Sequence, residues 1–164
     1  VALAHEEYLH FIRTVLATDC ADLIDIEFFT AGAELPALIE EARTAGAAVV
    51  CSSHDFHKTP PRAELVSRMV AMQQAGADLP KLAVMPQSRA DVLELLAATA
   101  EMADRHPETP IITMSMGSLG VITRMAGEVF GSSMTFGAVG QVSAPGQIPV
   151  ERLRNALQIL HTSC

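Results

Sequence analysis

The chain has 164 residues, of which 49% are hydrophobic and 18% are charged. This balance excludes a disordered chain, because a chain of this size and hydrophobicity can bury a substantial core. The formal net charge of −8 and the lack of any local cluster of Lys and Arg argue against a nucleic-acid-binding protein. A membrane protein is also excluded, since Glu94 and Glu101 interrupt the longest apolar run well below the ~18 residues of a membrane span.

Helical and strand-like periodicities alternate along the sequence. In chain order we expect a helix at 5–18, a strand at 21–29, a helix at 33–45, a strand at 47–53, a helix at 62–75, a strand at 80–85, a helix from a Ser88 cap to about 104, a strand at 110–115, a short helix at 121–129, a strand at 134–139, a loop at 140–149 and a helix at 150–160. Strands that recur about every 25 to 33 residues are typical of βα units with a parallel sheet.

The fold class is therefore α/β, with two possible architectures. No GxGxxG or GxxxxGK[ST] motif follows any expected strand, which disfavours nucleotide-binding folds. The five βα units and the leading helix fit either a small open sheet or the last two thirds of a (β/α)8 TIM barrel, a fold that has eight strands and typically about 250 residues.

Cysteine and histidine usage bears on location and metal binding. Cys20, Cys51 and Cys164 are odd in number and lack CxxC spacing, so we expect a reduced, cytoplasmic protein. The six histidines form no HExxH motif and no His/Cys cluster with zinc spacing, so we expect no metal ion.

A reactive cluster follows the strand at 47–53, in the segment from Cys51 to Pro60. α/β enzymes usually present their chemistry on loops of this kind, where a buried strand ends. The two histidines, His54 and His57, are either plain surface polarity or include a general acid/base that titrates near neutral pH. We favour His54 because the strand end fixes its position.

Lys81 is the second candidate, and it shares strand parity with Ala83 and Met85. It is either a strand-end residue that reaches solvent or an amine in apolar surroundings, where the neutral nucleophile is favoured and can form a Schiff base with a ketone. Asp25 and Glu27 share one face of the strand at 21–29. They could orient a histidine or lysine, or could be solvated on an open sheet.

Two further features admit a functional and a structural interpretation. Arg124 follows Gly117 and Gly120 in a short helix, where it is either a surface charge or, if it faces a site, a bidentate ligand for a carboxylate. The loop at 140–149 contains glycines together with hydroxyl and amide side chains. It is either an ordinary connection or a lid that closes over a site.

Taken together, these motifs closely resemble the type I 3-dehydroquinate dehydratase family, whose members are (β/α)8 barrels of the shikimate pathway. The resemblance runs over nearly the whole chain and rests on segments in one order: Ile24–Glu27, Ser53–Pro60, Pro80–Gln87, Ile111–Met116, Arg124 with Ala126–Gly131, and Ser143–Gln147.

The resemblance implies a role for each candidate residue. Lys81 would form the Schiff base, and His54 would be the residue that transfers protons. Arg124 would bind the substrate carboxylate, and the lid residues Ser143 and Gln147 would contact the substrate. The implied reaction is dehydration of 3-dehydroquinate to 3-dehydroshikimate, a lyase step of chorismate and aromatic amino acid biosynthesis, with no metal or cofactor. A homodimer is also implied.

The same resemblance implies that residues 1–164 form a single partial TIM-barrel domain, with the family's first three strands absent ahead of Val1. Two other functions remain as alternatives. One is another Schiff-base barrel of the aldolase type, against which the His54 loop and the Ser143–Gln147 segment argue. The other is a non-catalytic dehydratase-like domain that binds a ligand for regulation, against which the presence of both Lys81 and His54 counts.

Overall fold

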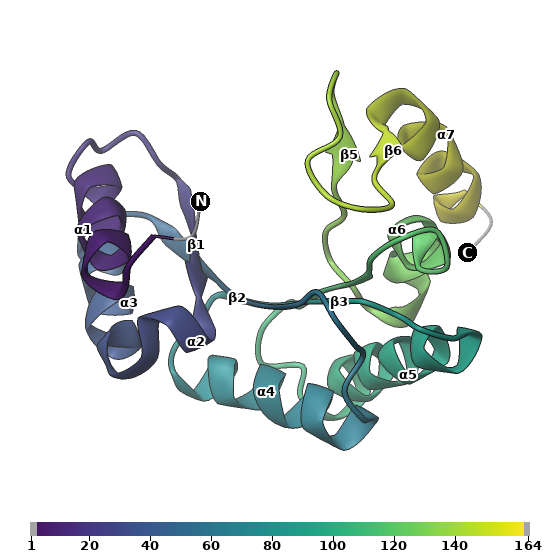
Figure 1. The fold of residues 1–164 in the computed structure, drawn as a ribbon, viewed down its shortest axis with the longest axis horizontal. Helices are drawn as coiled ribbons and strands as arrows, with labels where there is room; N and C mark the ends of the chain where they lie inside the picture. The colour runs from purple at the N-terminus through teal and green to yellow at the C-terminus, as the bar shows by residue number, and fades with distance from the viewer. Residues whose placement is uncertain (1–2, 163–164) are drawn as a thin grey trace.

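Four parallel strands form the main sheet of the computed structural model, which describes residues 3–162. Their order in the sheet follows their order in the chain: β1 (Leu23–Glu27), β2 (Ala48–Asp55), β3 (Leu79–Val84) and β4 (Ile112–Ser115). The long helices lie on the outer side of this curved sheet: α1 (His5–Leu16), α3 (Leu35–Thr44), α4 (Arg62–Gln74) and α5 (Arg89–Arg105) (Figure 1). The predicted α/β fold with a parallel sheet is therefore confirmed.

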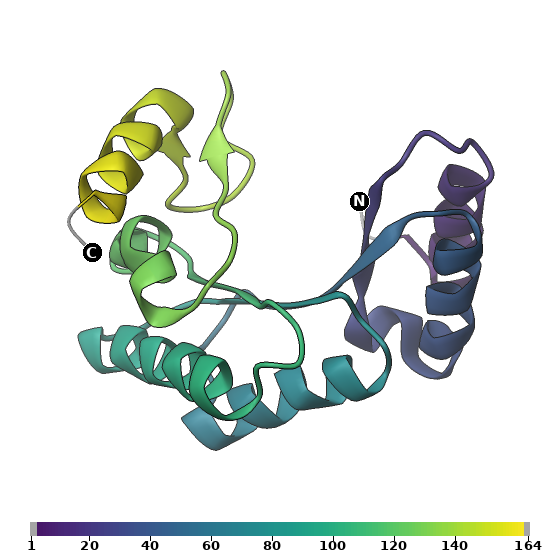
Figure 2. The same cartoon turned by 180° about the vertical axis from the view of Figure 1, so that it is seen from behind.

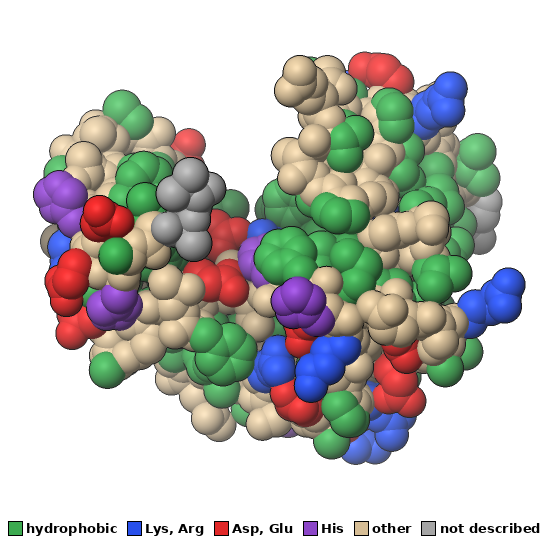
Figure 3. All heavy atoms as spheres, viewed as in Figure 1, with side chains coloured by type: hydrophobic (Ala, Val, Ile, Leu, Met, Phe, Trp, Pro, Cys, Tyr) green, Lys and Arg blue, Asp and Glu red, His purple; other side chains and the backbone are tan. Residues whose placement is uncertain are grey.

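The residues after β4 build one arm of the molecule, and α1 to α3 build the other (Figure 2). The C-terminal arm contains α6 (Val121–Ala126), the 3-10 helix η2 (Gly127–Phe130), β5 (Gly137–Ala138), β6 (Ile148–Pro149) and α7 (Val150–His161). The space-filling view is hollowed between the two arms (Figure 3). None of the helices in the described part of the chain has the length and hydropathy to span a membrane.

Local sequence signals account for several helix ends. The hydroxyl of Ser88 accepts a hydrogen bond from the backbone N–H of Asp91 at 3.3 Å, which caps the start of α5 as predicted. Gly46 and Gly76 follow α3 and α4 with φ angles of 77° and 96°. Only glycine adopts this left-handed conformation without strain, and for this reason both helices end there.

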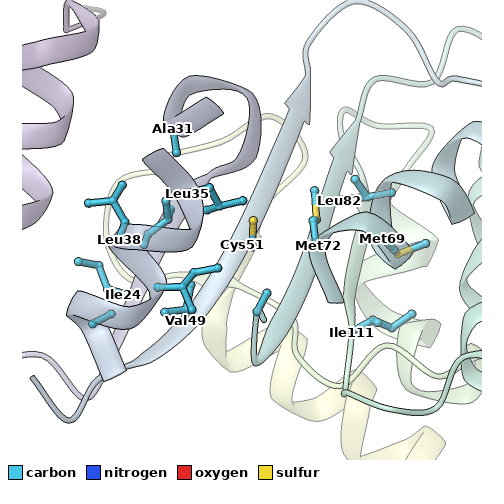
Figure 4. Packing of buried hydrophobic residues seen from close by; sticks show 14 of the residues in the cluster. Ile24, Ala31, Leu35, Leu38, Val49, Cys51, Met69, Met72, Leu82 and Ile111 are labelled. Atoms are coloured by element: carbon cyan, nitrogen blue, oxygen red, sulfur yellow. The ribbon is translucent and has the colours of Figure 1, made fainter. Parts of the chain in front are cut away.

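The sheet has two unlike faces because side chains alternate along each strand. One face packs against the outer helices and is apolar; Figure 4 shows part of this core, which includes Ile24, Val49, Cys51, Met69, Met72 and Leu82. The opposite face carries a smaller apolar cluster of Val50, Ala83, Ile112, Met114 and Met116. The long helices leave this second face uncovered, so a strand residue of that parity can meet a ligand.

The prediction of a strand at 134–139 in the main sheet was wrong. Only Gly137–Ala138 is a strand, and it pairs in parallel with Ile148–Pro149 instead of with β4. The chain does meet the edge of the sheet at a parallel bridge between Ile111 and Ser132. There the side-chain oxygen of Ser132 accepts the backbone N–H of Thr113 at 3.0 Å, and this donor would otherwise be available to the backbone of a fifth strand.

The strand predicted at 21–29 is also shorter than expected. The chain leaves β1 at Glu27 and turns directly into α2 (Phe28–Ala31), which leads into the 3-10 helix η1 (Gly32–Glu34). Glu27 is therefore the last residue of its strand. Its side chain consequently lies at the carboxyl edge of the sheet, where neighbouring strands also end.

Candidate active site

A cleft of about 300 Å³ lies over the uncovered face of the sheet, at the carboxyl ends of the strands. In parallel α/β folds this edge is the usual place for an active site. All five predicted site residues line the cleft: His54, Lys81, Arg124, Ser143 and Gln147. The structure therefore brings together side chains from β2, β3, α6 and the loop at 140–149.

A larger hollow of about 490 Å³ lies on the other side of Arg124, between η2 and α7. Among the described residues that line this hollow, only Arg124 and Glu128 have titratable side chains. Because no lysine and no histidine of residues 3–162 lines this hollow, we place the candidate site in the smaller cleft.

Lys81 is buried, with 8% of the residue exposed, and it points to the uncovered face. Its Nζ atom donates a hydrogen bond to Oδ2 of Asp25 at 2.6 Å and lies 5.2 Å from the centre of the Phe136 ring. The carboxylate and the ring face both stabilise a positive charge on this nitrogen. Asp25 is also the acceptor positioned to take a proton from the amine.

His54 is oriented by Glu27. The Nδ1 atom of His54 lies 2.8 Å from Oε2 of Glu27, and the backbone N–H of His54 donates to Oε1 of the same carboxylate at 3.1 Å. Ser52 donates a third hydrogen bond to Glu27 at 2.8 Å. A carboxylate on Nδ1 fixes the ring and leaves Nε2 available for proton transfer.

The charge of Glu27 depends on these contacts. Burial by itself raises the pKa of this carboxyl group, but the hydrogen bonds from His54 and Ser52 outweigh it and leave the pKa below its usual value of 4.5. Glu27 is therefore ionised at neutral pH, which is the state that accepts three hydrogen bonds.

Tyr8 on α1 holds the backbone of Glu27. Its hydroxyl oxygen accepts the backbone N–H of Glu27 at 2.8 Å. Burial raises the pKa of Tyr8, so the hydroxyl remains neutral. Helix α1 thereby fixes the backbone of β1 at the point where the site begins.

The Glu27 network predicts a pH-dependent stability. Folding lowers the pKa of Glu27 below the usual value of 4.5. The ionised carboxylate therefore adds to the free energy of unfolding above that usual value, and this stabilisation is lost as the pH falls through the pKa of the folded state. We expect Glu27→Gln to lower the free energy of unfolding by about 1.5–3 kcal/mol at neutral pH, with a smaller difference at acidic pH. Urea unfolding at both pH values measures this, with the exposed Glu108 as the matched control in Glu108→Gln. An equal loss at both pH values would contradict the assignment.

Arg124 is a buried cation without an acidic partner among residues 3–162. It is 1% exposed, its Nη2 donates to the carbonyl of Pro145 at 3.2 Å, and its Nη1 lies 3.5 Å from the sulfur of Met114. The Nε atom has no hydrogen-bond partner within the described part of the chain. Burial lowers the pKa of Arg124, but a guanidinium remains protonated. The open donors therefore suit an anionic ligand such as a carboxylate.

Ser143 and Gln147 lie in the loop that covers one side of the cleft. The backbone N–H and the hydroxyl of Ser143 donate to Oε1 of Gln147 at 2.8 and 3.1 Å. This pair closes the loop on itself, and the Gln147 amide nitrogen is left to donate to a ligand.

His57 lies outside the cleft on an exposed turn. Asp55 accepts the backbone N–H groups of His57 and Lys58, each at 3.0 Å, and these bonds lower its pKa despite the opposing effect of burial. The segment that contains His57 is therefore held as a turn. The sequence did not predict that Ser52, Tyr8 or Phe136 lies near the site. Ser52 shares strand parity with His54, and this is a signal that the sequence does contain.

Cys20 and Cys51 are free, whereas Cys164 lies outside the described residues. Burial, with smaller effects from the charges of Asp25 and Glu27, raises the pKa of Cys51 to about 12, so its thiol stays neutral. Within residues 3–162 there is no group of three or more His, Cys, Asp or Glu side chains arranged to hold a metal ion.

Comparison with known proteins identifies the family of the chain. A family model described as type I 3-dehydroquinase matches residues 1–164. The 3-dehydroquinate dehydratases of Salmonella agona and Salmonella typhimurium are 54% and 53% identical over 160 residues, which make up 98% of this chain and 64% of each relative. The chain thus spans just under two thirds of the length of these relatives.

Solved structures give the same assignment. Type I 3-dehydroquinate dehydratase from Clostridium difficile, solved with covalently modified comenic acid, matches with 47% identity and a TM-score of 0.94 over 100% of this chain and 65% of that one. The 3-dehydroquinate dehydratase of Geobacillus kaustophilus matches with 41% identity and a TM-score of 0.93, over 99% and 62% of the two chains. The chain belongs to the type I 3-dehydroquinase family.

Proposed function

We propose that the protein containing this chain is a hydro-lyase that dehydrates 3-dehydroquinate to 3-dehydroshikimate through a Schiff base. The single observation that carries the proposal is the arrangement of Lys81, His54 and Arg124 around one cleft of about 300 Å³. A nucleophilic amine, a general acid/base and a carboxylate-binding cation are the three groups that this elimination needs.

The reaction begins at Lys81. Its neutral amine adds to the ketone carbon of the substrate, and loss of one water gives an iminium ion. Asp25, 2.6 Å from Nζ, receives the proton that the ammonium must lose and returns it to the carbinolamine hydroxyl, which leaves as the water. The carboxylate of Asp25 is thereby ionised again and faces the cationic iminium nitrogen. The iminium withdraws electrons and thereby acidifies the adjacent C–H.

His54 then transfers the proton in two steps. Its Nε2 removes a proton from the carbon next to the iminium, and Glu27 on Nδ1 stabilises the resulting imidazolium. The protonated ring donates to the leaving hydroxyl, which departs as water and leaves a carbon–carbon double bond. Addition of water to the iminium releases the product and restores the Lys81 amine.

The remaining groups hold the substrate. The open donors of Arg124 bind its carboxylate, while Ser143 and Gln147 contact the substrate from the lid.

In line with the family, we also propose that the protein is a cytoplasmic homodimer and that the four-stranded sheet is part of a (β/α)8 TIM barrel. The parallel β1-β2-β3-β4 order with helices on the outer face supports the barrel.

Borohydride trapping tests the chemistry. Incubation of the full-length protein with 3-dehydroquinate and borohydride reduces the iminium to a stable amine, so peptide mass spectrometry is expected to find the adduct on Lys81. Substrate without borohydride is the control, because the imine hydrolyses before digestion. A protein that turns over substrate without an adduct on Lys81 would refute the Schiff-base mechanism, and one that binds substrate without turnover would favour the non-catalytic alternative.

A further inference from the structure

The loop at 140–149 is fastened to the rest of the site through one carbonyl group. The oxygen of Pro145 accepts a hydrogen bond from the backbone N–H of Gly117 at 3.2 Å and another from Nη2 of Arg124, also at 3.2 Å. Gly117 belongs to the loop between β4 and α6, and Arg124 lies on α6. The carbonyl thus connects the lid to the residue that we assign to the substrate carboxylate.

At the next residue, Gly146, the lid backbone touches the β4–α6 loop directly. A Cβ atom at position 146 would lie 2.4 Å from the carbonyl oxygen of Gly117, 2.9 Å from its carbonyl carbon and 3.0 Å from its nitrogen. Backbone atoms cannot move aside as the end of a flexible side chain can. The lid can therefore dock on Gly117 only if residue 146 has no side chain.

Gly140 provides an internal comparison at the other end of the same loop. Gly140 and Gly146 both have a φ angle of 77°, so an alanine at either position carries a similar backbone strain. A Cβ atom at Gly140, however, would meet nothing within 4 Å. Any difference between the two alanine variants therefore reports the contact with Gly117 and not the left-handed conformation.

The docked segment carries the two lid residues of the site. Ser143 and Gln147 flank Pro145 and Gly146, and they are joined by hydrogen bonds of 2.8 and 3.1 Å. Because these bonds close a short ring around Pro145 and Gly146, the place where Gly146 rests on Gly117 sets the position of both side chains in the cleft. We propose that Gly146 is a positioning residue, whose contact with Gly117 docks the lid and places Ser143 and Gln147 over Lys81.

This inference extends the proposed function, since it concerns the lid of the same site. The test compares Gly146→Ala with Gly140→Ala in the full-length protein by steady-state kinetics and by hydrogen exchange at the Gly117 amide. In Gly146→Ala we expect kcat/KM for 3-dehydroquinate to fall about 10²-fold, with a rise in KM, because the substrate contacts of the lid are displaced. The Gly117 amide should exchange at least about tenfold faster once its bond to Pro145 opens. Gly140→Ala should change each quantity by less than about threefold.

Equal kcat/KM values and equal Gly117 exchange rates in the two variants would overturn the proposal. So would a Gly117 amide in the unsubstituted protein that exchanges as fast as exposed loop amides, and this measurement needs no variant. Borohydride trapping on Lys81 separates the two hypotheses: an adduct together with equal variants refutes only the role of Gly146. Absence of an adduct refutes the proposed chemistry, while the exchange rates still report whether the lid docks through Gly146.

Discussion

Substitution of Lys81 by methionine is expected to lower kcat/KM by at least about 10⁴-fold and to abolish the borohydride adduct. The reason is that the elimination depends on an iminium at the ketone carbon, and among the described residues that line the cleft only Lys81 has an amine that can form it. Methionine has a similar length and suits the apolar cluster around Ala83 and Met114. The side chain of Asp25 is 44% exposed, so water can solvate its carboxylate once the ammonium is gone. We therefore expect a folded but inactive protein.

The chain contains a matched control, because Lys58 is its only other lysine. Lys58 is exposed, and among residues 3–162 it makes hydrogen bonds through its backbone N–H and carbonyl groups alone. Lys58→Met should keep kcat/KM within about threefold and keep the adduct, since the substitution is on the surface. An adduct that survives in Lys81→Met, or one that disappears in Lys58→Met, would contradict the assignment of the nucleophile.

Most of the site that could be predicted from the sequence follows from the alternation of side chains along the strands. Alternation along β3 puts Lys81 on the same face as Ala83, and alternation along β1 does the same for Asp25 and Glu27. The sequence alone left open whether these carboxylates were solvated, because alternation along a strand does not show whether that face of the sheet is covered. The parallel register places Glu27, Ser52 and Lys81 in one row across three strands, which brings the carboxylate of Glu27 within reach of His54. The contact between Lys81 and Asp25 depends instead on the long lysine side chain, which reaches a carboxylate outside its own row.

Other features could not be read from local pattern. Arg124 follows two glycines in a short helix, which is typical of a surface charge, yet it is 1% exposed and hydrogen-bonded to the carbonyl of Pro145 in the loop at 140–149. The segment at 134–139 has the residue types of a strand. However, the backbone N–H of Thr113 donates to the side chain of Ser132 and not to the backbone of an added strand. Both outcomes depend on residues distant in the sequence, and propensity does not contain such information.

Replacement of His54 by alanine is expected to separate the two halves of the reaction. Imine formation requires Lys81 and not the imidazole, so borohydride should still trap the adduct. Removal of the adjacent proton and departure of the hydroxyl both lose their proton carrier, which should slow turnover by about 10²–10⁴-fold. His57→Ala is the matched control, because that histidine lies on the exposed turn held by Asp55 and should change turnover by less than about threefold. Single-turnover kinetics with mass spectrometry of the trapped peptide measures both steps. A His54→Ala protein that turns over normally, or one that fails to form the adduct while still folded, would assign proton transfer to another group and leave Glu27 as a structural carboxylate.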